Sequence, residues 1–359
     1  VRHPEHETFL EENWLYEAIT EAYLPLLQIL EGWVRDGIHA RLTLTLSPTL
    51  CSMLLDPLLQ DRYVRYLNGL IELAEKETHR THWDARLNPL ARFYHDRFRR
   101  LHETYFAHDR NLVEAFRAFQ ELERLEIITS SATHAVLPLL QNHLPSLRAQ
   151  ILTARDHYRH CFGRDPRGIW LPECAYTDGV ERLLQEARIR WFITDTHGLL
   201  HARPRPRYGV FAPILTPIGV AAFGRDVESA KQVWSKHEGY PGDVRYRDFY
   251  RDIGFDLDLD YLRDYLPASP QRSFTGLKYF AITGPGSEKT VYDPASARRV
   301  AEEHAGHFLS ARQKQLQRLA GLMDRPPVVL APYDAELFGH WWYEGPEFLD
   351  FLFRKTAAQ

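Results

Sequence analysis

Residues 167–197 read RGIWLPECAYTDGVERLLQEARIRWFITDTH, and their pattern sets the predicted fold class. Apolar residues at 167–173 predict a strand, the spacing at 178–188 predicts a helix, and 190–197 predicts a second strand. Two strands joined by one helix favour a parallel pair of strands with the helix packed outside the sheet.

The same alternation extends along most of the chain. Apolar periodicity and short apolar runs predict further helices at 9–35, 146–161 and 295–323, and further strands at 40–46, 126–134, 210–215, 220–223, 276–283 and 326–331. No G-x-G-x-x-G motif accompanies these units, so a dinucleotide-binding fold is not favoured. The sequence therefore predicts an α/β protein with a parallel sheet.

Residues 54–125 interrupt this alternation. The segment is charged, contains a single glycine, and carries apolar residues such as Tyr63, Leu67 and Leu70 at helical spacing. We expect it to form a helical insertion within the α/β part.

Composition limits the possible partners. The chain has 359 residues, with 44 basic and 48 acidic side chains and a formal net charge of −4 at pH 7. This balance argues against nucleic acid and anionic membranes as partners, and no apolar run approaches the roughly 18 residues of a membrane span. The three widely spaced cysteines, Cys51, Cys161 and Cys174, fit a reducing compartment, so we expect a cytoplasmic protein that acts on a neutral substrate.

Polar side chains stand where several predicted strands end. In a βα barrel the carboxyl ends of the strands meet on one face, and that face carries the catalytic residues. The Asp residues at 195 and 226 are equally compatible with a simple role as helix N-caps. The strand-end residues are His134, Glu173, Asp195 with His197, Arg225 with Asp226, and Asp334.

Glu173 and Asp334 are the sharpest candidates, because each carboxylate directly follows an apolar segment. Two carboxylates on different strands suit glycoside chemistry, in which one attacks the anomeric carbon and the other protonates the leaving oxygen. Retaining enzymes hold such a pair about 5–5.5 Å apart and inverting enzymes about 6.5–9.5 Å apart. The sequence leaves this separation open.

The segment 330–346, LAPYDAELFGHWWYEGP, places acids and an imidazole beside paired indoles. Indole faces stack on the C–H surfaces of sugars, so we expect His340, Trp341 and Trp342 to contact substrate. For Glu336 we favour a structural carboxylate over a catalytic one.

Residues 224–272 form a long polar and aromatic region. A loop of this length in a compact domain is usually functional or disordered, and a surface excursion is the alternative to a functional role. We interpret residues 225–243 as a lid over the site, with Trp234 and Tyr240 as candidate substrate contacts.

The motifs WLPECAY (170–176) and APYDAELFGHWW (331–342) resemble those of glycoside hydrolase family 57, and the subgroup of 1,4-α-glucan branching enzymes fits best. The resemblance extends to IITSSATH (127–134), to VRHPEH at the start, and to QVWS and GYPG within the lid. It therefore covers nearly the whole chain.

This resemblance implies a distorted (β/α)7 TIM-like barrel formed by 1–53 and 126–359, with 54–125 as the helical insertion. It implies a retaining double displacement on amylose or glycogen, without a metal or organic cofactor. Glu173 corresponds to the nucleophile and Asp334 to the general acid and base. His134 matches an active-site histidine, and the candidate glucan-contacting aromatics are Trp14, Trp341 and Trp342.

The resemblance also implies parts outside this chain. Family members carry a strand with a His-x-His motif before the position of Val1, and a C-terminal helical domain after the acid/base motif. We expect this chain to lack both. The choice between a monomer and a dimer stays open.

Three alternatives remain. A family-57 α-amylase or 4-α-glucanotransferase would give linear products instead of α-1,6 branches. A non-catalytic glucan-binding module would bind without turnover. A metal-dependent deacetylase-like hydrolase, suggested only by the eighteen histidines, is the weakest of the three.

Overall fold

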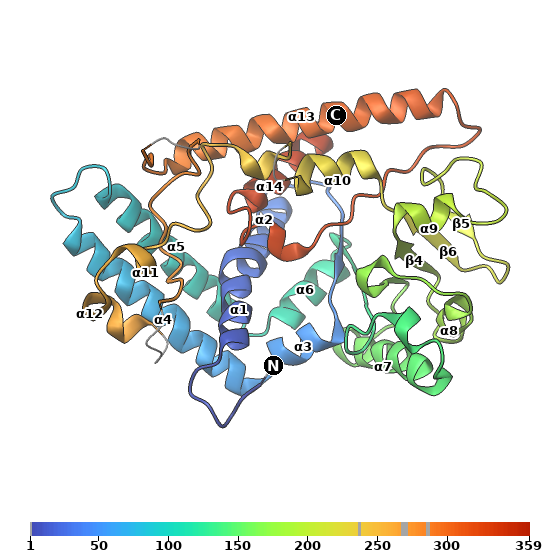
Figure 1. Cartoon of the computed structure of the whole chain (residues 1–359), viewed down its shortest axis with the longest axis horizontal. Helices are drawn as coiled ribbons and strands as arrows, with labels where there is room; N and C mark the ends of the chain where they lie inside the picture. Colours follow the sequence, from blue (N-terminus) through green and yellow to red (C-terminus); the bar gives the residue numbers. More distant parts are fainter. Residues whose placement is uncertain (1, 236–237, 267–271, 285–287) are drawn as a thin grey trace.

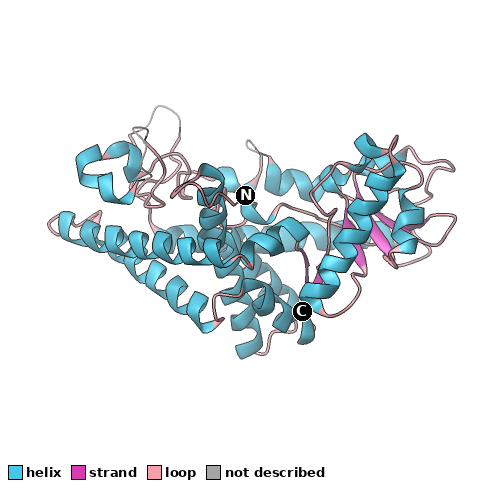
Figure 2. Ribbon diagram, turned by 90° about the horizontal axis from the view of Figure 1, so that it is seen from below, coloured by secondary structure: helices cyan, strands magenta, loops and turns pink. Residues whose placement is uncertain are grey.

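The structure, a computed structural model, describes residues 2–235, 238–266, 272–284 and 288–359. A helical part with α4, α5, α11 and α12 lies at one end of the molecule, and the sheet with α7, α8 and α9 lies at the other (Figure 1). Strands make up a small share of the chain and gather at that second end (Figure 2).

The α-helices alternate with the strands only in the middle of the chain. Their bounds are α1 Leu10–Ala18, α2 Leu24–Arg35, α3 Pro48–Leu54, α4 Pro57–Arg80, α5 Asn88–Ala107, α6 Leu112–Glu121, α7 Leu144–Phe162, α8 Val180–Glu186, α9 Thr196–Leu200, α10 Val227–Trp234, α11 Ile253–Asp256, α12 Leu259–Leu262, α13 Pro294–Ala320 and α14 Gly345–Ala357.

The predicted helix at 9–35 is confirmed, with one irregularity. A π-helical segment, Ile19–Tyr23, joins α1 to α2 without a break in the helical backbone. Such segments are rare and frequently occur at functional sites. This one contains the buried Glu21, which belongs to the candidate site described below.

The sheet is mostly parallel, as predicted. β1 pairs with β2, and β4 lies between β3 and β6, all in parallel, while β5 pairs with β6 in antiparallel fashion. A single parallel bridge between Thr129 and Ile169 connects the two groups of strands. The bounds are β1 Leu42–Thr45, β2 Leu125–Ile128, β3 Gly168–Trp170, β4 Trp191–Thr194, β5 Ile214–Leu215 and β6 Ala221–Gly224. The α/β class is therefore confirmed.

Two predicted strands are wrong. Residues 276–283 form isolated bridges through Phe280 and Ala281 instead of a strand. Residues 326–331 run extended, but are held by separate hydrogen bonds, from Val328 N to Phe211 O and from Asp226 N to Leu330 O. Apolar composition predicted strands here, but a strand also needs a continuous neighbour to form a ladder.

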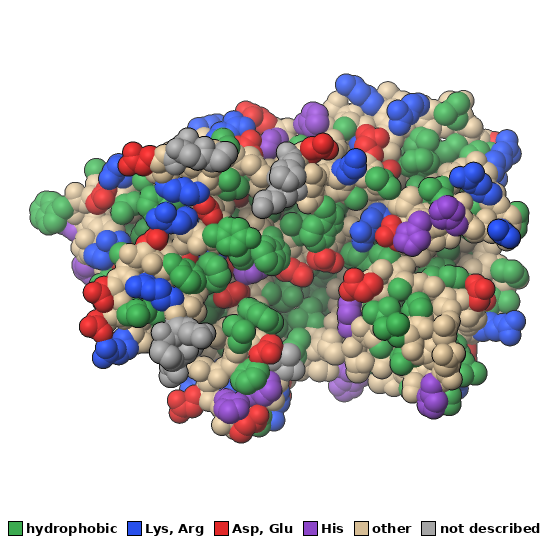
Figure 3. Space-filling model, in the orientation of Figure 1, with side chains coloured by type: hydrophobic (Ala, Val, Ile, Leu, Met, Phe, Trp, Pro, Cys, Tyr) green, Lys and Arg blue, Asp and Glu red, His purple; other side chains and the backbone are tan. Residues whose placement is uncertain are grey.

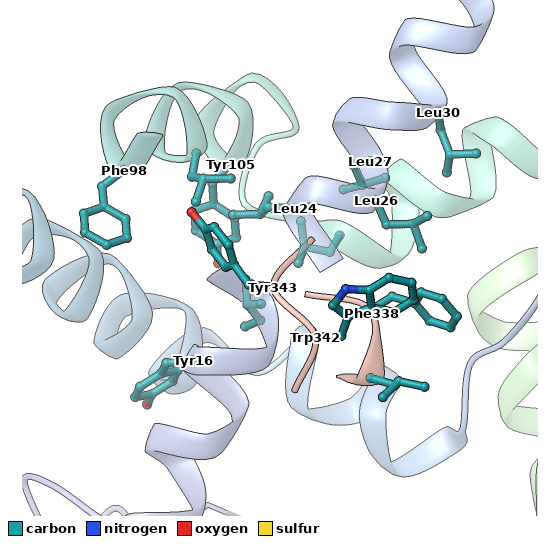
Figure 4. Close-up of a cluster of buried hydrophobic side chains, with 14 of the residues drawn as sticks. Tyr16, Leu24, Leu26, Leu27, Leu30, Phe98, Tyr105, Phe338, Trp342 and Tyr343 are labelled. Carbon is teal, nitrogen blue, oxygen red and sulfur yellow. The ribbon is translucent and has the colours of Figure 1, made fainter. Parts of the chain in front are cut away.

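The segment 54–125 is helical, as predicted, and packs into the main core. Buried tyrosines of α4 and α5, among them Tyr63, Tyr94 and Tyr105, belong to one hydrophobic cluster with α1, α2, α13 and α14. Figure 4 shows part of this cluster, in which Tyr105 and Phe98 lie across from Leu24, Tyr343 and Trp342. A second cluster joins α7 and α8 to the sheet. The first cluster also includes Leu337, Phe338 and Trp342, and it therefore anchors the segment that follows Asp334.

Candidate active site

Glu173 lies on a strained turn directly after β3. In this carboxylate turn, residues 171–174, Glu173 has φ 56° and ψ 21° and Cys174 has φ 55°. The left-handed region costs a non-glycine residue of order 1–3 kcal/mol, and such conformations cluster at functional sites. Trp170 Nε1 donates to Cys174 Sγ over 3.1 Å, and Thr194 Oγ1 donates to the Cys174 carbonyl over 2.9 Å. These bonds hold the backbone of the turn, from which the largely exposed Glu173 side chain extends.

His134 faces this carboxylate from the loop that follows β2. Its Nε2 lies 3.6 Å from Glu173 Oε1, a charge contact longer than a normal hydrogen bond. His134 also has a positive φ, 56°. Gln150 of α7 supports its turn, because its side chain accepts from Thr133 N and donates to Thr133 Oγ1, both over 2.9 Å.

Asp334 occupies the N-cap position of a short 3-10 segment, Ala335–Leu337; its side chain makes no capping hydrogen bond, and the residue is more than a third exposed. Burial raises the pKa of Asp334, and the negative charges of Glu336 and Glu173 add to this, while Arg225 and His134 oppose it. These groups therefore lie within range of one another's charge, although they come from separate segments of the chain. A carboxyl group with a raised pKa is suited to donate a proton near neutral pH.

Arg225 follows β6 and points toward the same place. Its Nη2 lies 3.6 Å from Cys174 Sγ, and its charge lowers the pKa of Asp334. Its Nε is buried without a hydrogen-bond partner among the described residues. This guanidinium links the carboxylate turn to Asp334.

The two remaining strand-end aspartates are helix caps. Asp195 Oδ1 accepts from Thr196 N over 2.6 Å at the start of α9. Asp226 Oδ2 accepts from Ser229 N over 2.8 Å at the start of α10, and also from Arg312 of α13 over 3.0 Å. The buried Asp226 is therefore structural, as the capping alternative allowed.

An open cleft of about 1180 Å³, which we refer to as the aromatic cleft, is lined by Glu336, His340 and Trp341 of the segment after Asp334, but not by Asp334 or Glu173 themselves. Figure 3 shows the molecule hollowed across its middle, where hydrophobic and acidic side chains meet. Trp341 is half exposed and stacks on Phe249, with ring centroids 4.5 Å apart. Residues that line the cleft include Trp14, Glu17, Tyr66, Phe249, Phe255, Phe274, Glu336, His340 and Trp341. Glu336 lines this cleft, and its negative charge raises the pKa of Asp334, two residues before it.

A charge network lies beneath the aromatic cleft. Glu21 Oε2 lies 2.7 Å from His340 Nδ1, and Glu21 Oε1 accepts from Arg247 Nη2 over 2.8 Å. Burial favours the protonated form of Glu21, but Arg247 and His340 outweigh it and hold the pKa well below its usual range. Glu17 lies 3.9 Å from His340 Nε2, and burial, followed by the charge of Glu21, raises its pKa to about 7.

Sequence reasoning missed Glu17, Glu21 and Arg247. Glu17 and Glu21 stand four residues apart among the apolar residues that predict the buried face of this helix, and this was a usable signal, because carboxylates are almost never buried without a partner. The partner Arg247 gave no such signal, because it lies more than two hundred positions away and only tertiary contact shows its role.

Two predicted substrate contacts do not hold. Trp342 is 1% exposed and packs on Phe348 within the core. Tyr240 is also buried, and its hydroxyl lies 2.7 Å from His307 Nδ1 of α13. Neither ring can present a face to a sugar in this arrangement. Trp14 and Trp341 are exposed in the aromatic cleft, whereas Trp234 is exposed at the end of α10.

Within the described ranges, no three His, Cys, Asp or Glu side chains come together in a way that could hold a metal ion. The described helices include none that is both long and apolar enough to cross a membrane.

A pair of carboxylates near an aromatic cleft, Glu173 after β3 and Asp334 after the extended segment 326–331, is typical of proteins that act on glycosides. The comparison with known families agrees: the chain belongs to glycosyl hydrolase family 57, whose family model matches residues 1–357.

Curated relatives are named branching enzymes. The chain is 31% identical to 1,4-alpha-glucan branching enzyme TK1436 of Thermococcus kodakarensis, over 94% of this chain and 51% of the relative. It is 30% identical to a probable 1,4-alpha-glucan branching enzyme of Mycobacterium tuberculosis, over 97% of this chain and 64% of the relative. The chain thus spans about half to two thirds of these proteins.

Solved structures include both amylase and branching members. An alpha-amylase, AmyC from Thermotoga maritima, superimposes with a TM-score of 0.94 at 46% identity, over 98% of this chain and 68% of that chain. A branching enzyme of the same family from Pyrococcus horikoshii gives a TM-score of 0.86 at 31% identity, over 100% of this chain and 65% of that chain.

Proposed function

We propose that the chain is the catalytic part of a 1,4-α-glucan branching enzyme, which cleaves an α-1,4-glucan and transfers the segment to a 6-hydroxyl group. The observation that carries this proposal is that Asp334, whose pKa is raised, lies within charge range of Glu173 on another segment of the chain. The branching-enzyme names of its curated relatives support the choice of reaction.

In the proposed reaction Glu173 attacks the anomeric carbon while Asp334 protonates the leaving oxygen, which gives a glycosyl-enzyme intermediate. Asp334 then removes a proton from the acceptor 6-hydroxyl, which attacks the same carbon and releases Glu173. The raised pKa of Asp334 suits the first step, because the group must be protonated there. Arg225 and His134 lie near the two carboxylates, and both lower the pKa of Asp334.

The acceptor must reach the intermediate faster than water does. We assign glucan binding to the exposed indoles of Trp14 and Trp341 in the aromatic cleft, where flat aromatic faces are available to pyranose rings. His340 fixes the segment that carries Trp341 through its contact with Glu21. Ordered acceptor binding raises the effective concentration of the 6-hydroxyl and favours transfer over hydrolysis.

The finer details of the fold and setting belong to the same proposal. We interpret the strands and the extended segment 326–331 as parts of a distorted (β/α)7 barrel formed by 1–53 and 126–359, with 54–125 as its helical insertion. A cytoplasmic location and amylose or glycogen as substrate complete the proposal.

The lid proposal applies to the described part of 225–243. Its ends are anchored, because Asp226 pairs with Arg312 and Tyr240 is buried against α13 and α14. We therefore assign substrate contact to Trp234 alone. Trp234→Ala should raise the ratio of hydrolysis to branching, with Trp83→Ala, at a fully exposed helix tip, as the matched control. An unchanged ratio would remove the lid from the mechanism.

A second candidate function is an α-amylase, favoured by the 46% identity and TM-score of 0.94 with AmyC. Hydrolysis and branching share the first half-reaction, so the site carboxylates do not separate them. Only the acceptor differs, water in one case and a sugar hydroxyl in the other.

The deciding experiment measures product linkages. Purified chain is incubated with amylose, and the products are assayed for new α-1,6 bonds by proton NMR, for reducing ends, and for chain length after debranching. Branching predicts new α-1,6 bonds with few new reducing ends. Reducing ends without α-1,6 bonds would overturn branching in favour of hydrolysis, and binding without turnover would favour a glucan-binding module. Glu173→Gln serves as the inactive control.

A further inference from the structure

Two of the three cysteines face each other across a helix pair that takes no part in the proposed reaction. Cys51 lies in α3 and Cys161 near the end of α7, and these two helices pack against each other. Both thiols are free and buried, and the packing of α3 on α7 places them close enough for each to affect the pKa of the other. The two residues are far apart along the chain, so only the fold brings them together.

A histidine connects the two helices at the same point. His157 of α7 lies one helical turn before Cys161, and its Nδ1 is 3.6 Å from Cys161 Sγ. Its Nε2 is 3.0 Å from the Oγ of Ser52, the residue next to Cys51. Ser52 is exposed and His157 is partly exposed, so the thiol pair lies one side chain below the surface.

The two sulfur atoms are not equivalent. Hydrogen bonding from Cys51, helped by His157, lowers the pKa of Cys161 against the effect of burial. Hydrogen bonding to Cys161, together with burial, raises the pKa of Cys51 well above its usual value. A low-pKa thiolate beside a protonated partner thiol is the arrangement in which thiols react selectively with oxidants.

We propose that Cys51 and Cys161 form an oxidant-sensitive thiol pair that closes reversibly to a disulfide between α3 and α7. With hydrogen peroxide as oxidant, the Cys161 thiolate attacks the O–O bond, forming a sulfenic acid and releasing hydroxide. Cys51 then attacks that sulfur: the S–S bond forms, the S–O bond breaks, and the Cys51 proton leaves with the hydroxide as water. Overall, two thiols and one peroxide give one disulfide and two waters, and an added dithiol reverses the step.

The bridge would act on a helix that also supports the candidate site. Gln150 of α7 holds the turn that carries His134, as described above, and α3 follows directly after β1. The disulfide would tie the far end of α7 to α3 and leave the carboxylate turn untouched. Cys174, whose sulfur lies against Trp170 and Arg225, provides an internal control.

The test uses the unmodified chain. It is treated with hydrogen peroxide, free thiols are alkylated after unfolding, and peptides are analysed by mass spectrometry with and without a dithiol. The expected result is a dithiol-sensitive peptide pair that joins Cys51 to Cys161, while Cys174 stays alkylated. Alkylation of all three cysteines after peroxide treatment, or a Cys174 crosslink in place of the expected one, would overturn the proposal.

Variants separate the roles of the three groups. Cys161→Ser and Cys51→Ser should each abolish the crosslink, and Cys161→Ser should also abolish formation of sulfenic acid at this pair. His157→Asn should slow closure several-fold at neutral pH and leave its final extent unchanged, because the thiolate is less favoured. A His157→Asn rate equal to that of the unmodified chain would remove His157 from the proposal, and a sulfenic acid found on Cys51 would reverse the assigned order of attack.

Discussion

His134 Nε2 lies 3.6 Å from Glu173 Oε1, and both residues have φ values of 56°. They follow two different strands, β2 and β3, which meet at a single bridge between Thr129 and Ile169. Two residues with strained backbones, whose side chains face each other across neighbouring loops, indicate a site in which position matters more than local stability.

Substitutions of Glu173 should affect activity through its proposed role as nucleophile and stability through its strained backbone. Glu173→Gln should lower turnover by about 10³-fold or more, since the nucleophile is lost, while glucan binding remains. Glu173→Gly should be more stable than Glu173→Ala by about 1 kcal/mol, because only glycine adopts φ 56° without steric cost. Kinetics and urea denaturation check both parts. Equal stability of the Gly and Ala variants would contradict the strain argument.

Asp334→Asn should slow both half-reactions, because the same group first donates and then accepts a proton. With a donor whose leaving group needs no protonation, only the second half-reaction should remain slow. Added azide should then restore turnover, since it attacks the intermediate without a general base. Rate measurements with and without azide check this, and an absence of rescue would argue against Asp334 as the base.

The charges around Asp334 predict shifts in the alkaline limb of the pH–activity profile. Activity needs protonated Asp334, so it should fall as pH rises through the pKa of this group. Glu336→Gln removes a negative charge that raises this pKa, so the limb should move to lower pH. Arg225→Gln removes a positive charge, so the limb should move to higher pH. Shifts in the same direction for both variants would exclude this assignment.

Glu17 predicts a pH-dependent cost in stability. Its pKa is raised to about 7 in the folded chain, against about 4.3 when unfolded, so the folded state binds the extra proton between these values. Stability should therefore fall as pH rises across this window. Glu17→Gln should stabilise the chain by ~1–3 kcal/mol at pH 8 and by much less at pH 4. Unfolding free energies at both pH values measure the effect, and a pH-independent difference would show that Glu17 is not strained by burial.

Substitution of Trp341 should affect glucan binding, whereas substitution of its neighbour Trp342 should affect stability. Trp341 is half exposed in the aromatic cleft, so Trp341→Ala should weaken glucan binding at little cost in stability. Trp342 is buried against Phe348, so Trp342→Ala should cost about 3–5 kcal/mol of unfolding free energy. Binding of maltooligosaccharides and thermal unfolding distinguish the two. Similar losses of stability for both would contradict the different environments.

Local patterns were sufficient for most helices and for the parallel strands of the sheet. Each is set by a short apolar period, which neighbouring residues decide among themselves. The sequence was also sufficient to single out the two motifs that contain Glu173 and Asp334, because the chemistry of their residues is visible in the chain. The family membership of the chain confirms that resemblance.

Only the tertiary structure decided which side chains of those motifs face the cleft. Trp341 and Trp342 are adjacent and chemically identical, yet the turn after the 3-10 segment sends one into the aromatic cleft and the other into the core. The partners Arg247 for Glu21 and Cys161 for Cys51 were equally hidden, because pairing over long sequence distances depends on how helices pack. Burial, and with it the raised pKa of Asp334 and Glu17, follows from that packing and has no local signature in the sequence.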